Sequence, residues 1–412
     1  MNAIKIIFLI CLLPFGSDAQ QSKTQKRPKA LFIIVDGIPA DVIEKLQPPC
    51  LMEISKVGGF TRSFTGGHKG TYDQTPTISA PGYNNLITGV WGNKHNVWDN
   101  DIANPNYNYW SIFRIAEKTN PSLKTAVFST WTDNRTKLIG EGLKEAGDIK
   151  LDFSFDGLEL DTITYPHDKE TTYIQKIDEA VTSEAARVAT EQSPDLSWVY
   201  MEFTDDVGHK YGDSDEFYNA VLGADRQIRK IWDAIKLREQ SFGEDWLIVV
   251  TNDHGRGAET GKNHGGQSDR ERATWIVTNS NNLNEHFKQT PAVVDILPSV
   301  CNHLGIKIPE EVRNELDGTP FIGTLEFSDM KATRNGSKIS IEWRSYVKDD
   351  RKVEIYVTPT NRVKVGDKDA YVKIGEVPMR QQKFQATFAS EAPIIKVLIK
   401  TPNQAGNYWL VK

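Results

Sequence analysis

Three residues of types that bind metal ions lie close together in the segment from Val249 to Gly265, V-V-T-N-D-H-G-R-G-A-E-T-G-K-N-H-G. Asp253 and His254 come shortly after an apolar run, and His264 follows in a glycine-rich loop. Open α/β sheets place their ligands at the carboxyl ends of their strands. Imidazole and carboxylate groups together suit a divalent ion such as zinc. The segment therefore predicts a metal site at a sheet edge.

Two other apolar runs lead into the same kinds of side chain. The run A-L-F-I-I-V ends at Asp36, and the run W-V-Y-M-E-F is followed by Asp205 and His209. Because Gly208 lies between Asp205 and His209, we expect a tight turn after this strand to direct both side chains toward one ion.

A serine in the segment P-T-I-S-A-P-G-Y, Ser79, is a candidate nucleophile. Pro81 favours a helix that begins close to Ser79, because proline is common in the first turn of helices. Free backbone N–H groups at a helix N-terminus attract anions such as phosphate. Most serines in this position only cap the helix, but a serine that attacks phosphate would need the same place.

The collected side chains are three aspartates, three histidines and one hydroxyl, which suit two divalent metal ions, with zinc favoured by the imidazoles. Two ions about 4 Å apart can hold both the entering and the leaving oxygen of a displacement at phosphorus. No P-loop motif and no convincing G-x-G-x-x-G motif competes with this interpretation. We expect Ser79 to be catalytic and the metal ligands to be Asp36, Ser79, Asp205, His209, Asp253, His254 and His264.

Strands and helices alternate in the part of the chain that must position these residues. Apolar runs near residues 30–35, 123–129, 196–203, 246–250 and 273–278 are typical of buried strands. Residues 170–192 and 217–237 have the pattern of amphipathic helices. Since three of the strands lead into Asp or Asp-and-His groups, we predict a doubly wound, mostly parallel α/β sheet with its site along one edge.

The sequence pattern changes from about Leu325, where short segments such as K-V-E-I-Y-V-T-P alternate apolar and polar residues. This pattern predicts a small all-β sandwich of about seven strands, similar to a fibronectin III domain. The expected organisation is a signal peptide at residues 1–19, a leader at 20–28, an α/β domain at 29–324 and the sandwich at 325–412.

Composition and the N-terminal stretch limit the compartment and the partners. A formal net charge of -6 over 412 residues gives no support for nucleic-acid binding. Residues 1–19 read as a cleaved secretory signal, because their apolar run is too short to span a membrane, and no other segment is long enough. We therefore expect a periplasmic or secreted protein without a transmembrane span. Cys50 and Cys301 could form one disulfide there.

These motifs together resemble the alkaline phosphatase superfamily. They are Asp36 in I-V-D-G, Ser79 in P-T-I-S-A-P-G-Y, Asp205 and His209 in D-D-V-G-H-K-Y-G, Asp253-His254-Gly255, and His264 in N-H-G-G. Within the superfamily, residues 29 to 305 are most similar to the nucleotide pyrophosphatase/phosphodiesterase branch. The resemblance implies one zinc bound by Asp36, Asp253, His254 and the Ser79 oxygen, and a second zinc bound by Asp205, His209 and His264. It also implies a covalent phospho-Ser79 intermediate that water hydrolyses.

The sequence departs from this family in three features. Ser79 stands where the branch usually has Thr, which also offers one hydroxyl. Gly82 stands where diesterase members often have an Asn that binds a phosphoryl oxygen, and the typical alkaline phosphatase arginine has no obvious counterpart. Asn84, Asn85 and the helix N–H groups are candidates to replace them, so the preference between monoesters and diesters stays open.

Aromatic and histidine side chains near Ser79 complete the set of candidates. His95, in the family-like motif W-G-N-K-H-N-V-W-D-N, is interpreted as structural. Tyr72 and Tyr83 could line a substrate pocket, although aromatic residues more often pack in a core.

The expected function is a two-metal phosphoesterase that hydrolyses phosphodiester or pyrophosphate bonds in a small-molecule substrate. One alternative is a phosphomonoesterase of the same superfamily. A second is a sulfatase, which S-A-P-G-Y resembles, although a sulfatase requires Arg in place of Tyr83 and converts the serine to an aldehyde. A third is a non-catalytic binding protein whose sandwich docks a glycan or another partner.

Overall fold

The computed structural model describes residues 26–412, so the predicted signal peptide and most of the predicted leader lie outside the described residues. The first strand begins at Arg27, which places residues 27 and 28 of the expected leader inside the sheet. Within residues 26–412, none of the helices combines the length and the apolar character that a membrane crossing requires.

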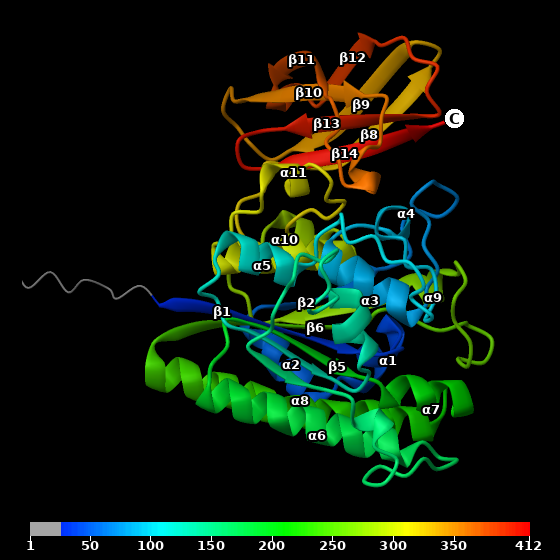
Figure 1. Cartoon of the computed structure of the whole chain (residues 1–412), viewed down its shortest axis with the longest axis vertical. Coiled ribbons are helices and arrows are strands. Elements are labelled where there is room, and N and C mark those ends of the chain that lie inside the picture. The colour runs from blue at the N-terminus through cyan, green and yellow to red at the C-terminus, as the bar shows by residue number, and fades with distance from the viewer. Residues whose placement is uncertain (1–25) are drawn as a thin grey trace, which may run out of the picture.

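A seven-stranded sheet forms the centre of the larger domain (Figure 1). In spatial order its strands are β2 (Gly59–Phe64), β7 (Ala273–Thr278), β6 (Glu244–Thr251), β1 (Arg27–Val35), β5 (Leu196–Met201), β3 (Thr125–Ser129) and β4 (Phe153–Phe155). The strands from β6 to β4 are parallel, whereas β7 is antiparallel to both β6 and β2. The predicted doubly wound, mostly parallel sheet is confirmed.

The register of the three central strands explains why the candidate site residues meet. β1 lies between β5 and β6, and Val35 pairs with Met201 while Ile34 pairs with Thr251. The three strands therefore end at the same level, and the residues that follow them emerge at one edge of the sheet. Strands buried on both faces need continuous apolar sequence, which is why the sequence pattern locates this edge.

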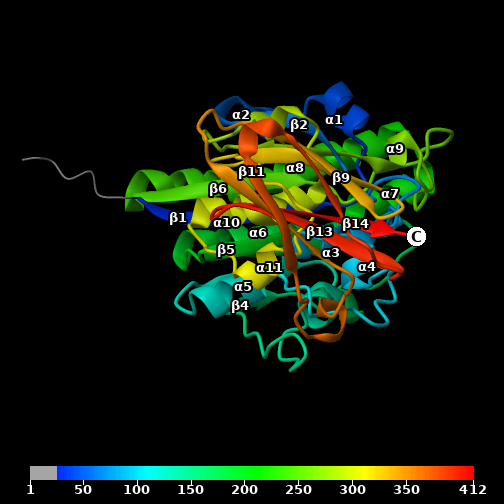
Figure 2. The ribbon, with the colours of Figure 1, turned by 90° about the horizontal axis from the view of Figure 1, so that it is seen from above.

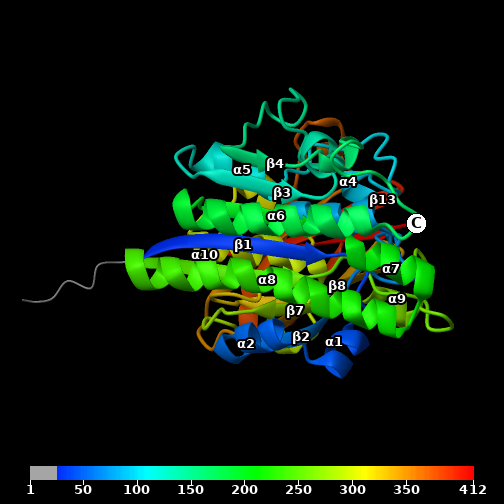
Figure 3. The same ribbon diagram turned by 90° about the horizontal axis from the view of Figure 1, so that it is seen from below.

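Helices cover both faces of the sheet in two layers (Figures 1 and 3). One face is covered by α1 (Ala40–Leu46), α2 (Pro49–Val57), α6 (Thr172–Glu191), α7 (Phe203–Tyr211) and α8 (Asp215–Phe242). The other face is covered by α3 (Ser79–Thr88), α5 (Ile112–Thr119) and α10 (Ile296–Leu304), and α11 (Glu310–Arg313) lies between α10 and the C-terminal strands (Figure 1). Two short helices, α4 (Gly92–His95) and α9 (Asp269–Arg272), lie in connecting segments.

Cys50 and Cys301 lie in different cores. Cys50 packs in the core under α8, and Cys301 packs in the core under α10, on the opposite face of the sheet. Both thiols are free. The expectation that they could form one disulfide is therefore wrong for this fold, because the sheet separates them.

Seven strands of the C-terminal region form the predicted sandwich (Figure 2). They are β8 (Phe327–Asn335), β9 (Lys338–Ser345), β10 (Lys352–Thr358), β11 (Val372–Pro378), β12 (Lys383–Thr387), β13 (Ile394–Lys400) and β14 (Ala405–Val411). One antiparallel sheet has the order β11-β10-β13-β14 and the other the order β12-β9-β8. Their facing side chains, such as Ile341, Ile355 and Val397, form a separate apolar core.

Buried charges fasten the sandwich to the α/β domain, on the side where β13 and β14 face the helices (Figure 1). Lys396 of β13 is fully buried, and its Nζ lies 2.5 Å from Glu315 Oε1 and 2.7 Å from Asp369 Oδ2. A buried ion pair requires its partners, because an unpaired charge in a dry interface is strongly destabilising.

Replacing Lys396 by methionine is therefore expected to destabilise the protein. The substitution leaves the Glu315 and Asp369 carboxylates without their counter-ion, which should lower the free energy of unfolding by about 3 kcal/mol. Urea unfolding of the wild type and of Lys396→Met measures this difference.

Lys352→Met is the matched control. Lys352 also pairs with a carboxylate, Glu376, at 3.0 Å, but 63% of its side chain is exposed. Solvent screens such pairs, so this variant should unfold at nearly the wild-type urea concentration. Equal losses in the two variants would contradict the assignment of Lys396 as a buried anchor.

Candidate active site

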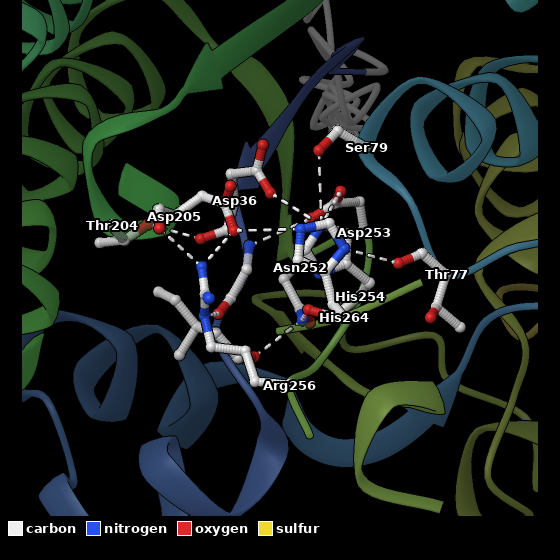
Figure 4. A network of polar contacts seen from close by, with 12 residues as sticks. Asp36, Thr77, Ser79, Thr204, Asp205, Asn252, Asp253, His254, Arg256 and His264 are labelled. Carbon is white, nitrogen blue, oxygen red and sulfur yellow. Dashed lines mark hydrogen bonds and ion pairs between the residues drawn. The ribbon is translucent and has the colours of Figure 1, made fainter. Parts of the chain in front are cut away.

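All seven candidate residues lie at the edge where β1, β5 and β6 end, and most of them are drawn in Figure 4. Six of them form two groups of three, and within each group the candidate ligand atoms lie within 4.8 Å of one another. We name them the first cluster (Asp36, Asp253 and His254) and the second cluster (Asp205, His209 and His264). The seventh residue, Ser79, lies beside the first cluster.

The first cluster is almost completely buried. His254 Nε2 lies 3.3 Å from Asp36 Oδ1 and 3.2 Å from Asp253 Oδ2. These two carboxylate oxygens have no hydrogen-bond partner within residues 26–412. Buried polar atoms without partners are rare because they lose their hydration without compensation. Two unpartnered oxygens and one imidazole nitrogen that face each other fit a divalent metal ion.

The second cluster lies on α7 and on the loop after β6. Asp205 Oδ2 and His209 Nε2 are 3.1 Å apart, and His264 Nε2 lies 3.0 Å from His209 Nε2. The predicted tight turn is wrong, because Asp205 and His209 belong to the helix α7. Residues four apart on a helix project from the same face, so the helix achieves what the turn was expected to do.

Backbone carbonyl groups determine which ring nitrogen of His254 and of His264 carries the proton. His254 Nδ1 lies 2.9 Å from the Gly255 oxygen, and His264 Nδ1 lies 2.8 Å from the Thr77 oxygen. A carbonyl oxygen can only accept, so each Nδ1 carries the proton and each Nε2 keeps its lone pair toward the cluster. The two rings stack with centroids 3.7 Å apart at 15°, which joins the two clusters.

Electrostatics in the first cluster favour a bound cation. Burial, and next the charge of Asp205, raise the pKa of Asp36 to about 7. Burial and the charge of Asp36 raise the pKa of Asp253 well above its ordinary value, while burial lowers the pKa of His254. Two adjacent buried carboxylates cannot both ionise easily without a positive charge between them. A divalent ion would supply that charge.

The second cluster has the opposite electrostatic character. Burial tends to raise the pKa of Asp205, but the hydrogen bond with His209 and the charge of Arg256 hold it below its ordinary value. The same hydrogen bond raises the pKa of His209, whereas burial lowers the pKa of His264. Asp205 is therefore an anion at neutral pH, ready to bind a cation.

Ser79 is the first residue of α3, as the position of Pro81 predicted. Its Oγ lies 3.4 Å from His254 Nε2. The backbone N–H groups of this turn are less available to anions than expected. The N–H of Ala80 donates to Asn100 Oδ1 at 3.0 Å, that of Gly82 donates to the Ile78 oxygen at 2.9 Å, and Pro81 has none.

Gly82 allows α3 to approach the first cluster closely. A Cβ at this position would lie 2.8 Å from the Cβ of Asp253, so no asparagine fits there. Asn84 and Asn85 are buried, and Asn85 Oδ1 contacts His95 Nε2 at 2.8 Å. The structure instead brings Asn100 next to Ser79. Its side chain is exposed, and its amide nitrogen makes no hydrogen bond within the described part of the chain.

Sequence reasoning missed several residues that hold the candidate ligands in place. Tyr200 donates a hydrogen bond to Asp36 Oδ2 at 2.8 Å, and Tyr83 donates to the same oxygen. Tyr83 therefore supports a candidate ligand and does not line a pocket. Arg256 is completely buried and binds Asp205 through its side chain and backbone oxygen, so it is not open to a phosphate group. Only the three-dimensional contacts identify these roles.

The fold and this site define the class of the protein, which is the alkaline phosphatase superfamily, as the sequence resemblance predicted. The profile of the family described as type I phosphodiesterase / nucleotide pyrophosphatase matches residues 30–372. The chain belongs to this family. The match extends beyond the α/β domain and includes strands β8 to β10 of the sandwich.

Individual relatives are distant. Ectonucleotide pyrophosphatase/phosphodiesterase family member 1 of Mus musculus is 21% identical over 232 residues, which are 55% of this chain and 24% of the relative. The chain thus spans about a quarter of the length of the curated relatives that it matches first. The solved structure of murine ectonucleotide pyrophosphatase/phosphodiesterase 5 has 14% identity and a TM-score of 0.48, and covers 68% of this chain and 96% of its own.

Another solved structure covers nearly the whole chain. The phosphonate monoester hydrolase of Agrobacterium radiobacter has a TM-score of 0.52 and 14% identity. The similarity covers 93% of this chain and 89% of that chain, which shows a shared fold.

His95 generates a prediction about stability and pH. It is fully buried, and its ring contacts Asn85 Oδ1 and the N–H of Val97, which agrees with the structural role interpreted from sequence. Burial lowers its pKa to about 3, whereas an unfolded histidine titrates near 6.5. Below pH 6.5 the unfolded chain gains a proton that the folded chain does not, so acidification favours unfolding.

We expect His95→Gln to lose this pH dependence. Between pH 6.5 and pH 5 the wild type should lose about 2 kcal/mol of unfolding free energy relative to the variant. Urea unfolding of both proteins at the two pH values gives the difference, in which the other titrating groups cancel. An identical pH dependence in the two proteins would show that His95 is not held neutral.

Proposed function

We propose that the protein is a two-metal phosphoesterase that hydrolyses phosphodiester or pyrophosphate bonds of small molecules, with Ser79 as the nucleophile. One observation carries the proposal: a buried serine hydroxyl lies beside two adjacent sets of three ligand side chains. Membership of the type I phosphodiesterase / nucleotide pyrophosphatase family supports the same reaction.

The donor sets suggest which residues would bind each ion. Asp36, Asp253 and His254, with the Ser79 oxygen, would hold one, and the second cluster would hold the other. Mixed carboxylate and imidazole ligands favour zinc. When bound, the two ions supply positive charge that lowers the pKa of a hydroxyl and stabilises the oxygens of a phosphoryl group.

The reaction proposed for Ser79 has two steps. Ser79 Oγ forms a bond to phosphorus while the bond to the leaving oxygen breaks, and the leaving group takes up a proton. Water then forms a bond to phosphorus, the Ser79 Oγ–P bond breaks, and the serine hydroxyl regains its proton. Ser79 Oγ is the entering oxygen in the first step and the leaving oxygen in the second, so one set of ligands could serve both steps.

Asn100 is the candidate to bind a phosphoryl oxygen. Its Oδ1 accepts a hydrogen bond from the N–H of Ala80, so its amide nitrogen would be the atom that donates to the phosphoryl oxygen. A donor next to the nucleophile can stabilise charge on the phosphoryl group. This assignment replaces Asn84, Asn85 and most of the helix N–H groups, which are buried or already bonded.

The site favours this proposal over the sulfatase alternative. Tyr83, at the position where a sulfatase needs Arg, is buried and bonds Asp36. A location in the periplasm or outside the cell is part of the proposal and depends on the predicted signal at residues 1–19.

Ser79→Ala tests the nucleophile. The alanine variant lacks the oxygen that attacks phosphorus, so we expect hydrolysis of bis-p-nitrophenyl phosphate to fall at least about a thousandfold. Mass spectrometry of the wild-type protein should find Ser79 unmodified, which would exclude the aldehyde that a sulfatase carries. Undiminished turnover by Ser79→Ala would refute the proposal.

Metal removal tests the cofactor. Dialysis against a strong chelator is expected to abolish diester hydrolysis, and added Zn²⁺ should restore it. Removal of the metal should also lower the melting temperature. Ligand binding stabilises the folded state, and without the ions the first cluster loses the charge that offsets its carboxylates. A protein that retains full activity with far fewer than two metal ions per chain would contradict this proposal.

A further inference from the structure

The segment that precedes the nucleophile lies against the last strand of the sandwich. The Tyr72 ring stacks on the Trp409 ring of β14, with centroids 5.7 Å apart and planes at 9°. The backbone N–H of Trp409 donates to the Tyr72 hydroxyl at 2.9 Å. Tyr408 meets the same tyrosine edge-on, with centroids 5.9 Å apart. Tyr72 thus packs on the sandwich and does not line a substrate pocket.

Trp409 is itself rigidly held. It is buried, and two buried ammonium groups approach its ring, with Lys94 Nζ at 5.0 Å and Lys396 Nζ at 5.3 Å from the centroid. Lys94 also donates to the Glu315 carbonyl oxygen at 2.7 Å and to Asn407 Oδ1 at 2.9 Å. Cation–π contacts are stronger when the groups are desolvated, so Trp409 is a fixed point between the two domains.

The segment that carries Tyr72 continues along the chain into the active site. The next residue, Asp73, organises the loop by accepting the His68 N–H at 3.0 Å and by contacting His68 Nδ1 at 2.7 Å. Farther along the segment, the Thr77 carbonyl oxygen fixes His264 Nδ1 at 2.8 Å, and the Thr77 hydroxyl donates to the Gly266 oxygen at 2.8 Å. Ser79 follows two residues later, so one short segment positions both the nucleophile and a ligand of the second cluster.

A second connection reaches the other side of the nucleophile. Lys94 is adjacent in sequence to His95, whose ring contacts Asn85 of α3 at 2.8 Å. Because α3 begins with Ser79, the sandwich contacts the segments on both sides of this residue. Domains of one chain usually move relative to each other unless their interface is large and well packed. Here the buried contacts fall on the segment that carries the nucleophile.

We propose that the C-terminal sandwich positions the nucleophile, and that Trp409 is the positioning residue through which it acts. The inference rests on the proposed role of Ser79, and it gives the sandwich a part in catalysis rather than in docking a separate partner. A displacement of about 1 Å at a reacting group can cost on the order of a hundredfold in rate. Loss of the stack should therefore be seen in turnover.

Trp409→Leu is the main test. The variant keeps an apolar side chain but loses the ring that Tyr72 and the two lysines contact. We expect kcat for bis-p-nitrophenyl phosphate to fall between about tenfold and a hundredfold, with KM changed less than about threefold. The zinc content per chain should equal that of the wild type.

Trp343→Leu is the matched control. Trp343 is the same residue type in the same domain, is equally buried, and donates its Nε1–H to the Met379 oxygen at 2.9 Å. It lies in the sandwich core, and its hydrogen bond stays within the sandwich. Its loss should lower the melting temperature at least as much as Trp409→Leu does, while kcat stays within about twofold of the wild type.

Two further variants separate positioning from stability. Trp409→Phe retains a ring for Tyr72 and should recover most of the lost kcat. Tyr72→Leu removes the stack without changing the sandwich, and it should lower kcat as Trp409→Leu does. The double variant should be no slower than the slower single variant, because both changes break one contact. Tyr72→Leu also keeps the test decisive if Trp409→Leu does not fold.

The outcomes distinguish this inference from the proposed function. Wild-type kcat in folded Tyr72→Leu or Trp409→Leu overturns the positioning role while leaving Ser79 as the nucleophile. Equal loss of kcat in Trp343→Leu also overturns it, since any weakening of the sandwich would then suffice. Failure of the proposed function would appear separately, as full activity of Ser79→Ala.

Discussion

Two carboxylates buried side by side impose the strongest constraint on this molecule. Asp36 and Asp253 are each about 1% exposed, and burial raises the pKa of both. The surrounding groups offset this cost in part, through the Tyr200 hydroxyl on Asp36 and the Gly37 N–H on Asp253 at 3.2 Å. One oxygen of each carboxylate still lacks a partner among the described residues. The edge of the sheet therefore favours a bound positive charge.

Much of the fold could be predicted from the sequence because the pattern follows from local physics. Strands buried on both faces must be apolar throughout, so the runs before Asp36, Asp205 and Asp253 were visible. Parallel pairing then brings their ends together, whatever the order of the remaining strands. Alternation in the C-terminal region indicated seven strands in the same way, and the structure has seven.

The rest depended on contacts between distant residues. Nothing in the sequence indicates that Arg256 serves Asp205, 51 residues away, or that Tyr200 and Tyr83 converge on Asp36. The local conformation after β5 was also misjudged. T-D-D-V-G-H has a glycine that suggests a turn, but burial of Val207 in the core stabilises the helix α7 there. Tertiary packing outweighs the propensity of one glycine.

The stack between His254 and His264 has a consequence for how the site can vary. Each ring belongs to a different cluster, and the two planes lie face to face. A change that tilts one imidazole must tilt or displace its neighbour, because packed rings leave no room for independent adjustment. The pair behaves as a single rigid spacer between the two halves of the site. A substitution that reshapes one half of the site would therefore change the geometry of the other half as well.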